Sequence, residues 1–482
     1  MIDLAAFAEA WFSWVWANKF ALAAWSIAIV AFVLVPFRRP PAEARSWLLV
    51  FFAFPWLALV GYWLIGRPYF ARDRRERIAR LPQLLERIDA AIQVQPAEPD
   101  LSAHNRIIAR VAQGIGRFPT VTGNRVEMLD DYHPAIDRIV ADIDRAEHHV
   151  HLEFYIFAND KLGERILAAI ERARARGVAC RVLIDALGSY SSIRAIKRRL
   201  RRCGAEAHDI LPFRRRLRSS RLDLRNHRKI AIMDGLIGYT GSQNMWDPTA
   251  HSRRANRDLL LRICGPAVSQ LQTVFASDWY LETLEQLADT RYFPDPIPAQ
   301  GHPAQIVASG PENPEVGVDL IFAQAMHNAA QDIVITTPYF IPNDALISAI
   351  KAAVLGGVRV RLITAAKSDN RLAGLAQQSY YSELLAAGLE IHLFGPDFLH
   401  AKHFRVDHEV SIVGTSNMDV RSFDLNAEID FISYDAQFAE ELRQLEERHL
   451  LHSNRLTPEK WNERSLWTKI LENSARLMSD LI

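Results

Sequence analysis

Cysteine is scarce in this sequence, and so is any excess of charge of one sign. Only three cysteines, Cys180, Cys203 and Cys264, occur in the 482 residues. Their odd number excludes a fully paired disulfide framework, and their spacing is unlike that of a zinc-binding motif. The formal net charge is +1, so the total charge points to no class of partner. We therefore expect a protein of a reducing compartment whose function lies in local motifs.

Charged residues are absent from two apolar stretches near the N-terminus, residues 20–37 and 46–66. A bilayer core of about 30 Å requires about 20 apolar residues per helix. Within residues 1–66 we predict an interfacial segment followed by a two-helix transmembrane hairpin, with a kink at Pro55. A cleaved signal peptide is a weaker alternative, because a second apolar stretch follows the first. Buried core helices are the other alternative, and the uninterrupted length disfavours them.

Basic residues flank the two apolar stretches unequally. Lys19 and the arginines of 67–80 lie at the outer ends, whereas the turn carries fewer, Arg38, Arg39 and Arg45. The excess at the outer ends favours both termini on the cytoplasmic side of the membrane. Residues 67–118 are predicted to form a basic juxtamembrane connector that can lie on anionic headgroups.

One polar pattern occurs twice in the chain. Residues 227–234 and 400–407 both read His-x-Lys-x4-Asp, and Gly-x-x-Asn follows each copy, at 241–244 and 414–417. Alternation along a strand places His and Lys of each copy on one face. Two copies brought together would form a cationic phosphate site in which one imidazole attacks and the other protonates the leaving group.

The repeated pattern defines the candidate site residues. The catalytic set is His227, Lys229, Asp234, His400, Lys402 and Asp407. The phosphate-binding set is Asn244, Asn417, Ser242 and Ser416. Within the catalytic set we expect Asp234 and Asp407 to hold local structure rather than touch substrate. No metal or other cofactor is expected, because the lysine pair supplies positive charge and no cluster of metal ligands is evident.

The remainder of the chain alternates strand and helix patterns in two similar halves. A strand is predicted at 150–157, a helix at 162–176 and a buried strand at 178–184, and 333–342 and 357–362 repeat this order. Alternation of this kind predicts an α/β fold with a mostly parallel sheet. A proline-rich segment at 293–298 separates the halves, which we place at residues 119–298 and 299–482.

The paired motif resembles the phospholipase D superfamily, and the surrounding residues resemble the bacterial cardiolipin synthases. This likeness covers nearly the whole chain and includes the segments 151–156, 181–185, 309–311, 337–340, 367–369, 379–381 and 414–428. It implies a duplicated phospholipase D-like α/β/α sandwich with two mixed, mostly parallel sheets related by a pseudo-twofold axis. It also implies a carboxylate that orients each histidine. We assign Asp258 to His227 and Glu428 to His400.

The function implied by the resemblance is phosphatidyl transfer. Two phosphatidylglycerol molecules would give cardiolipin and glycerol through a phosphatidyl-histidine, and the sequence leaves open which histidine attacks. A phospholipase D-type hydrolase or a transferase to another alcohol is the nearest alternative. A nuclease of the same superfamily and a non-catalytic membrane scaffold are less favoured, and we expect anionic phospholipids and a membrane, but no nucleic acid, as partners.

Two further stretches have a recognisable character. Residues 194–229 are rich in arginine, and as a cluster they suggest a surface that faces anionic lipid or gathers an anionic substrate. The region of Trp461, Trp467, Leu471 and Leu477 predicts an amphipathic helix. We expect this helix to pack on the domain, with membrane contact as the alternative.

Overall fold

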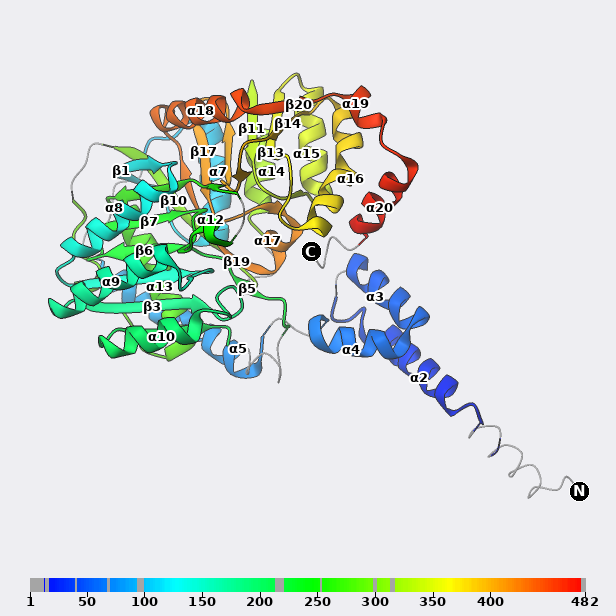
Figure 1. Cartoon of the computed structure of the whole chain (residues 1–482), viewed down its shortest axis with the longest axis horizontal. Helices are drawn as coiled ribbons and strands as arrows, with labels where there is room; N and C mark the ends of the chain where they lie inside the picture. The colour runs from blue at the N-terminus through cyan, green and yellow to red at the C-terminus, as the bar shows by residue number, and fades with distance from the viewer. Residues whose placement is uncertain are drawn as a thin grey trace, which may run out of the picture. The chain divides into compact units, whose positions relative to one another are not determined.

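The structure is a computed structural model of the chain, shown in Figure 1. It describes residues 13, 17–39, 41–66, 70–92, 99–212, 221–251, 254–297, 301–312 and 317–477. The chain divides into two compact units. The first comprises Met1–Arg75 with Phe213–Leu224, and the second comprises Glu76–Pro212 with Arg225–Ile482.

The first unit is a small helical assembly built from α2 (Lys19–Leu34), α3 (Pro41–Ala53) and α4 (Pro55–Ile65). Small and apolar side chains of these helices, Ala31, Phe51 and Ala58 among them, form its core. None of the helices in the described part of the chain has both the length and the apolar character needed to cross a bilayer. The predicted kink at Pro55 is a complete break. Phe54 leaves the helical region at φ −142° and ψ 67°, and Pro55 starts a new helix, since proline suits a first helical position.

The second unit begins with helices that connect to the sheet. They are α5 (Arg72–Ile78, which starts in the first unit), α6 (Leu81–Ala91) and α7 (Ala103–Gly116). The predicted connector is therefore helical. The guanidinium of Arg87 on α6 donates to Oε1 of Gln286 at 2.7 Å, which ties this segment to the first half.

The first half follows the predicted alternation. Its elements are β1 (Val121–Leu129), α8 (Tyr132–Arg145), β2 (His149–Phe154), α9 (Lys161–Ala175), β3 (Ala179–Asp185), α10 (Ile193–Arg202), β4 (Glu206–Ile210), β5 (Arg225–Asn226), β6 (Ile230–Met233), β7 (Ile237–Gly241), α12 (Pro248–His251), β8 (Asn256–Arg257), β9 (Leu260–Cys264), α13 (Ala267–Thr283) and η1 (Thr290–Tyr292). The second half repeats this order. Its elements are β10 (His302–Ser309), α14 (Asp319–His327), β11 (Asp332–Thr336), β12 (Phe340–Ile341), α15 (Asp344–Leu355), β13 (Arg359–Ala365), α16 (Arg371–Ala387), β14 (Glu390–Phe394), β15 (Phe398–Leu399), β16 (His403–Val406), β17 (Val410–Gly414), β18 (Met418–Asp419), α17 (Val420–Asp424), β19 (Asn426–Ser433), α18 (Ala436–Leu451), β20 (Ser453–Leu456), α19 (Pro458–Asn462) and α20 (Leu466–Arg476).

The strands of both halves form one continuous sheet rather than the two sheets predicted. Its order is β20-β14-β13-β11-β16-β17-β19-β10-β1-β9-β7-β6-β2-β3-β4, and β5 pairs with β19 off this path. The strand order β4-β3-β2-β6-β7-β9-β1 in the first half is equivalent to the order β14-β13-β11-β16-β17-β19-β10 in the second. The halves join because β1 and β10 pair antiparallel, Val121 opposite Ala304 and Asn124 opposite His302. Antiparallel pairing of equivalent strands is the arrangement that a pseudo-twofold axis through the sheet generates.

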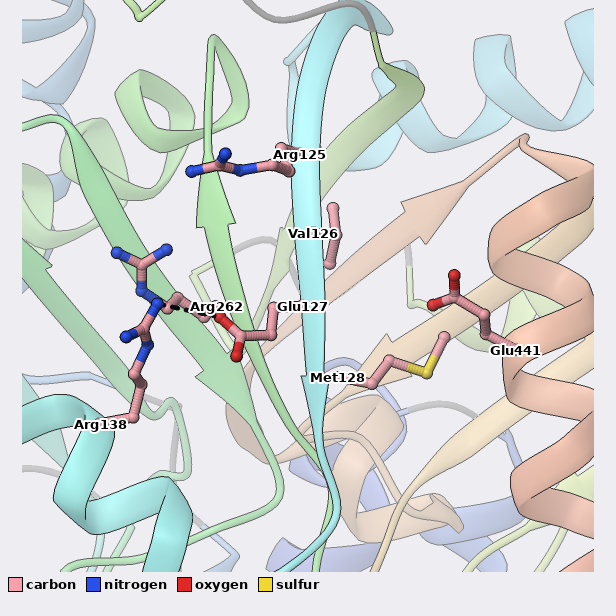
Figure 2. A pocket seen from close by; sticks show the side chains of 7 residues that line it. All are labelled: Arg125, Val126, Glu127, Met128, Arg138, Arg262 and Glu441. Atoms are coloured by element: carbon pink, nitrogen blue, oxygen red, sulfur yellow. Dashed lines mark hydrogen bonds and ion pairs between the residues drawn. The ribbon is translucent and has the colours of Figure 1, made fainter.

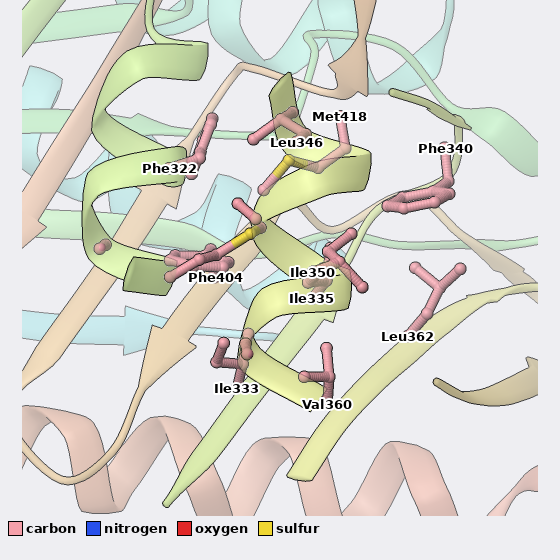
Figure 3. Packing of buried hydrophobic residues seen from close by; sticks show 14 of the residues in the cluster. Phe322, Ile333, Ile335, Phe340, Leu346, Ile350, Val360, Leu362, Phe404 and Met418 are labelled. Atoms are coloured by element: carbon pink, nitrogen blue, oxygen red, sulfur yellow. The ribbon is translucent and has the colours of Figure 1, made fainter. Parts of the chain in front are cut away.

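Helices cover both faces of the sheet in each half. In the second half, Ile333 and Ile335 of β11 and Phe404 of β16 pack beneath α14 and α15, as Figure 3 shows. Alternate residues point to the other face, where Arg405 pairs with Glu446 of α18 at 2.8 Å. This two-sided covering confirms the predicted α/β/α layering and explains why the strands are apolar with single buried charges.

Candidate active site

The two motifs lie where the chain passes from one strand partner to another. His227–Lys229 separate β5 from β6, and His400–Lys402 separate β15 from β16. The short strands β5 and β15 pair parallel with the opposite half, with β19 and β8 respectively. The strands β6 and β16 pair antiparallel within their own half. The predicted strand therefore begins three residues after each histidine, because the motif itself forms the crossing between two ladders.

Because of this crossing, the ring of each histidine is held by a carboxylate from the opposite half. The Nδ1 atom of His227 lies 3.0 Å from Oε2 of Glu428, and Nδ1 of His400 lies 2.6 Å from Oδ1 of Asp258. The two carboxylates were identified correctly in the sequence, but the assignment of each to the histidine of its own half is wrong. Register is the reason, because β5 pairs with Asn426 and Ala427 just before Glu428, and β15 pairs with Asn256 and Arg257 just before Asp258.

Backbone hydrogen bonds repeat the exchange. The amide of His227 donates to the carbonyl of Ala427 at 2.8 Å, and the amide of His400 donates to the carbonyl of Arg257 at 2.8 Å. Each motif is thereby fixed on the partner half by a main-chain bond as well as by its ring. Both rings remain slightly open, with side-chain exposures of 12% for His227 and 14% for His400.

A buried lysine accompanies each histidine. Nζ of Lys229 donates to the carbonyl oxygen of His227 at 2.7 Å, and Nζ of Lys402 makes the same bond to His400, also at 2.7 Å. Nζ of Lys402 also lies 3.1 Å from Nε2 of His400. Burial lowers the pKa of Lys229 to about 7 and that of Lys402 to about 8, although nearby carboxylates oppose the shift. An anionic ligand would restore the charge of both.

Burial lowers the pKa of both histidines, and their charged neighbours differ. Burial, followed by Lys229, Lys402 and His400, holds the pKa of His227 well below its usual range. Burial and Lys402 also lower the pKa of His400, but Asp258 opposes them. The lysines of both motifs affect the pKa of each histidine. The two imidazoles and two ammonium groups therefore share one electrostatic environment, as the repeat predicted.

The loops after the motifs contribute amides and hydroxyls. Oδ1 of Asn244 accepts a bond from the amide of Ile156 at 3.1 Å, and Oδ1 of Asn417 is buried without a partner in the described part of the chain. The two serines, which were predicted to bind phosphate, have other partners in the structure. The hydroxyl of Ser242 donates to Asp258 at 2.5 Å, and the hydroxyl of Ser416 donates to Asp430 at 2.5 Å. The hydroxyl protons of these serines therefore bind carboxylates rather than phosphate.

Sequence reasoning missed Thr415. The amide of Ser242 donates to the carbonyl of Leu259 at 2.9 Å, and the amide of Thr415 donates to that of Ile429 at 3.0 Å. Thr415, not Ser416, is therefore the structural counterpart of Ser242. Counting from the glycine that precedes each loop, rather than from the shared serine, would have identified it.

Asp234 and Asp407 hold backbone amides in their own halves, as expected of residues that anchor the chain. Asp234 accepts bonds from the amides of three consecutive residues, 147–149, at 2.8–2.9 Å. Asp407 does the same for residues 330–332, at 2.7–2.9 Å. Both have positive φ, 56° and 50°. Each therefore fixes the start of the central strand of its half, β2 or β11, which agrees with the expectation that both residues hold local structure.

Arg228 is a second residue whose role the sequence did not reveal. Its side chain points opposite to those of His227 and Lys229, is buried, and pairs with Asp278 at 2.5 Å. It also donates to the carbonyls of Glu428 and Ser309, at 3.1 and 3.0 Å. Arg228 thus joins α13 of the first half to two strands of the second, directly beneath the motif.

Cationic residues elsewhere are only partly free for a ligand. On α10, Lys197 pairs with Asp209 at 2.5 Å and Arg199 with Glu171 at 2.7 Å, whereas Arg198 and Arg201 are exposed. The arginines at 214–216 and 218 lie outside the described residues. A pocket of about 540 Å³ lies along β1. It is lined by Arg125, Val126, Glu127, Met128, Arg138, Arg262 and Glu441, which Figure 2 shows. No motif residue lines this cavity.

Comparison with known proteins agrees with this geometry. The family model described as "Cardiolipin synthase, PLD-like domain" matches residues 139–279 and 322–450. The cardiolipin synthase of Geobacillus kaustophilus is 32% identical over 469 residues, which cover 95% of this chain and 92% of the relative. That of Listeria monocytogenes is 34% identical over 458 residues, covering 92% and 95%. A crystal structure of phosphatidylserine synthase from Haemophilus influenzae has the same fold, with a TM-score of 0.59 and 16% identity over 78% of this chain and all of that one. The chain therefore belongs to the cardiolipin synthase family, with a duplicated PLD-like catalytic unit.

Proposed function

We propose that the chain transfers a phosphatidyl group from one phosphatidylglycerol to another, giving cardiolipin and glycerol. The observation that carries the proposal is the matched pair of imidazoles. Each has its Nδ1 atom held by a buried carboxylate and a buried lysine beside it, so that Nε2 would be the reacting atom of each ring. Paired groups of this kind suit an in-line exchange at phosphorus in which one ring attacks and the other moves a proton.

The reaction balances without a nucleotide or a metal ion as co-reactant. Nε2 of one imidazole attacks phosphorus, the bond from phosphorus to the glycerol headgroup breaks, and the second imidazolium gives its proton to the departing oxygen. The terminal hydroxyl of a second phosphatidylglycerol then attacks the phosphatidyl-histidine while the second imidazole, now neutral, takes the hydroxyl proton. The phosphorus–nitrogen bond breaks and the first imidazole is restored.

The electrostatic difference between the rings supports His227 as the nucleophile and His400 as the acid and base. A nucleophile must be neutral, and the pKa of His227 lies well below its usual range because of burial and the two lysines. The acid must carry a proton, and although burial and Lys402 lower the pKa of His400, Asp258 at 2.6 Å from its ring opposes them and would stabilise the imidazolium during the reaction. Lys229 and Lys402, with the carboxamides of Asn244 and Asn417, would bind the phosphate oxygens and the negative charge that grows on them.

The helices α2–α4 would hold the enzyme on the membrane that contains its substrates. Apolar side chains of these helices are exposed, among them Phe20, Trp25, Phe32, Leu49 and Leu57, and contiguous apolar surface of this kind marks a membrane or protein contact. We place the protein at a bacterial inner membrane with the catalytic unit on the cytoplasmic side, in accord with the basic flanks. Residues 119–298 and 299–482 are proposed as two copies of one ancestral unit, with residues 1–66 and 67–118 as anchor and connector.

The test is the product analysis of purified full-length protein in phosphatidylglycerol vesicles. We expect cardiolipin and glycerol in equal amounts, resolved by mass. His227→Ala and His400→Ala should each abolish them, whereas the matched control His104→Ala, at an exposed position on α7, should not. Phosphatidic acid without cardiolipin would instead assign a hydrolase, and a product with an added alcohol would assign a different acceptor. Greater phosphodiesterase activity on DNA than on lipid would favour a nuclease, and unchanged product in both site variants would favour a scaffold.

A further inference from the structure

The C-terminal helix α20 presents an apolar face to the outside. Leu466, Trp467, Ile470, Leu471 and Leu477 are all exposed, Trp467 by 76% and Leu477 by 87%. At 100° per residue these side chains cover one side of the helix, and no charged residue lies among them. A surface helix of a soluble domain normally carries its polar residues on this side, so the pattern needs an explanation other than packing within the domain.

The opposite side of α20 accounts for its packing. Glu472 and Ala475 are buried there, and Glu472 pairs with Arg464 at 3.3 Å. The guanidinium of Arg464 lies 3.3 Å from the centroid of the Trp461 ring, and Trp461 itself is buried against Tyr381 of α16 at a ring distance of 5.2 Å. The predicted amphipathic region thus divides. Trp461 packs inward as expected, whereas Trp467, Leu471 and Leu477 do not.

Basic side chains border the apolar face. Nζ of Lys469 donates to the carbonyl of Asn462 at 3.2 Å, and Arg476 lies over the ring of Tyr380 at 4.1 Å. The anionic residue of the helix, Glu472, is turned inward and paired. A helix with tryptophan and leucine on one side and cations at the border has the composition of helices that lie in the interface of an anionic bilayer.

Helix α16, against which α20 packs, extends toward the catalytic site. Arg476 of α20 lies 3.8 Å from Glu383 of α16. Just before the N-terminal end of α16, Asp369 accepts a hydrogen bond from Tyr339 and lies near enough to Lys402 to raise its pKa. One helix, α16, therefore connects α20 with a residue that acts on the motif lysine.

We propose that the apolar face of α20, formed by Leu466, Trp467, Ile470, Leu471 and Leu477, is a second membrane contact that seats the catalytic unit on an anionic bilayer. The choice of a lipid surface over a second copy of the chain rests on the proposed function, whose substrate resides in the bilayer, and on the bordering cations. The contact is distinct from the helices α2–α4.

A fluorescent label on the helix tests the contact directly. Full-length protein carrying Leu471→Cys, in a Cys203→Ser background, is labelled with an environment-sensitive dye and reconstituted in phosphatidylglycerol–phosphatidylcholine vesicles. The remaining native cysteines, Cys180 and Cys264, are buried. The matched control is Gln444→Cys, an exposed position on α18, the helix that covers the face of the sheet where Arg405 pairs with Glu446.

A nitroxide placed near the lipid headgroup should quench the dye at position 471 at least about threefold more strongly than at position 444, because an interfacial helix lies within the headgroup and upper acyl region. Soluble iodide should show the reverse order. Equal quenching at the two positions would overturn the proposal. So would a dye at 471 that is shielded from both quenchers while copies of the chain cross-link through α20, which would assign a protein interface instead.

Activity provides a second readout. The double variant Leu466→Ser/Leu471→Ser changes only outward side chains, and we expect about tenfold lower transferase activity on vesicles because part of the interfacial binding is lost. Activity on phosphatidylglycerol dispersed in detergent micelles should stay within about twofold, since no bilayer has to be bound there. An equal loss in vesicles and micelles would contradict membrane seating. Absence of transferase activity in every preparation would contradict the proposed function, whereas the quenching experiment would still decide the contact.

Discussion

Asp258→Asn preserves the shape of the side chain and removes the charge that faces His400. The carboxylate oxygen lies 2.6 Å from Nδ1 of His400, and both groups are shielded from solvent. A hydrogen bond to a charged group contributes about 1.5–3 kcal/mol. Since about 1.4 kcal/mol corresponds to one pKa unit, the pKa of His400 should fall by about one to two units in the variant.

The direction of this shift decides which step slows. A lower pKa reduces the protonated fraction of His400 near neutral pH by about 10- to 100-fold, so release of glycerol, which requires that proton, should slow by a similar factor. A lower assay pH should recover part of the loss. With a p-nitrophenol leaving group, whose departure needs no proton, the first step should change by no more than about threefold.

Glu428→Gln is the matched comparison, because Glu428 orients His227 instead. If His227 attacks phosphorus, this variant should slow cleavage of both substrates. The assay follows glycerol by enzymatic coupling and nitrophenolate by absorbance. Equal losses on both substrates in Asp258→Asn would refute the assignment of His400 as the acid. A selective loss of glycerol release in Glu428→Gln would mean that the two histidines have the opposite roles.

Three other changes have expected outcomes. Asp234→Ala removes an acceptor shared by three backbone amides, so the free energy of unfolding, measured by urea titration, should fall by about 2–4 kcal/mol. Activity per folded molecule should be retained, and a specific loss of activity would give Asp234 a catalytic role. The pKa values of Lys229 and Lys402 are lowered to about 7 and about 8, so both lysines lose their proton as the pH rises. The affinity for inorganic phosphate, measured by calorimetry, should therefore weaken progressively from pH 6 to 9. A flat profile would contradict neutralisation of the pair. Arg228→Met leaves the buried carboxylate of Asp278 unpaired and should cost about 3–5 kcal/mol of stability, whereas the double variant with Asp278→Asn should cost less, and additive losses in the cycle would contradict direct coupling.

The motifs could be predicted from local patterns because their reactive residues recur at a fixed spacing in the sequence. The strand and helix periods, the duplication and the anchoring role of Asp234 and Asp407 all follow from short segments. The pairing of His227 with Glu428 does not, because it depends on the two-residue ladder between β5 and β19, which joins opposite halves. No spacing within one half contains that information, and proximity in the chain favours the wrong carboxylate.

The other differences have local as well as long-range causes. Hydropathy predicted one span over 46–66, but Pro55 starts a separate helix. Composition predicted one amphipathic region near the C-terminus, but the turn between α19 and α20 directs Trp461 inward and Trp467 outward. The alignment of Ser242 with Thr415 is seen in their equivalent backbone bonds to Leu259, just before β9, and to Ile429 of β19, and the glycine before each loop already carried that information in the sequence.

The exchange of carboxylates has a consequence for how such a duplicated chain can evolve. A substitution at Asp258 or Glu428 alters the reactivity of an imidazole encoded in the other repeat, so neither repeat can drift or specialise in isolation. Separated fragments of the chain would each contain a complete motif yet lack the acidic neighbour that its ring requires, and only their reassociation would restore a working pair.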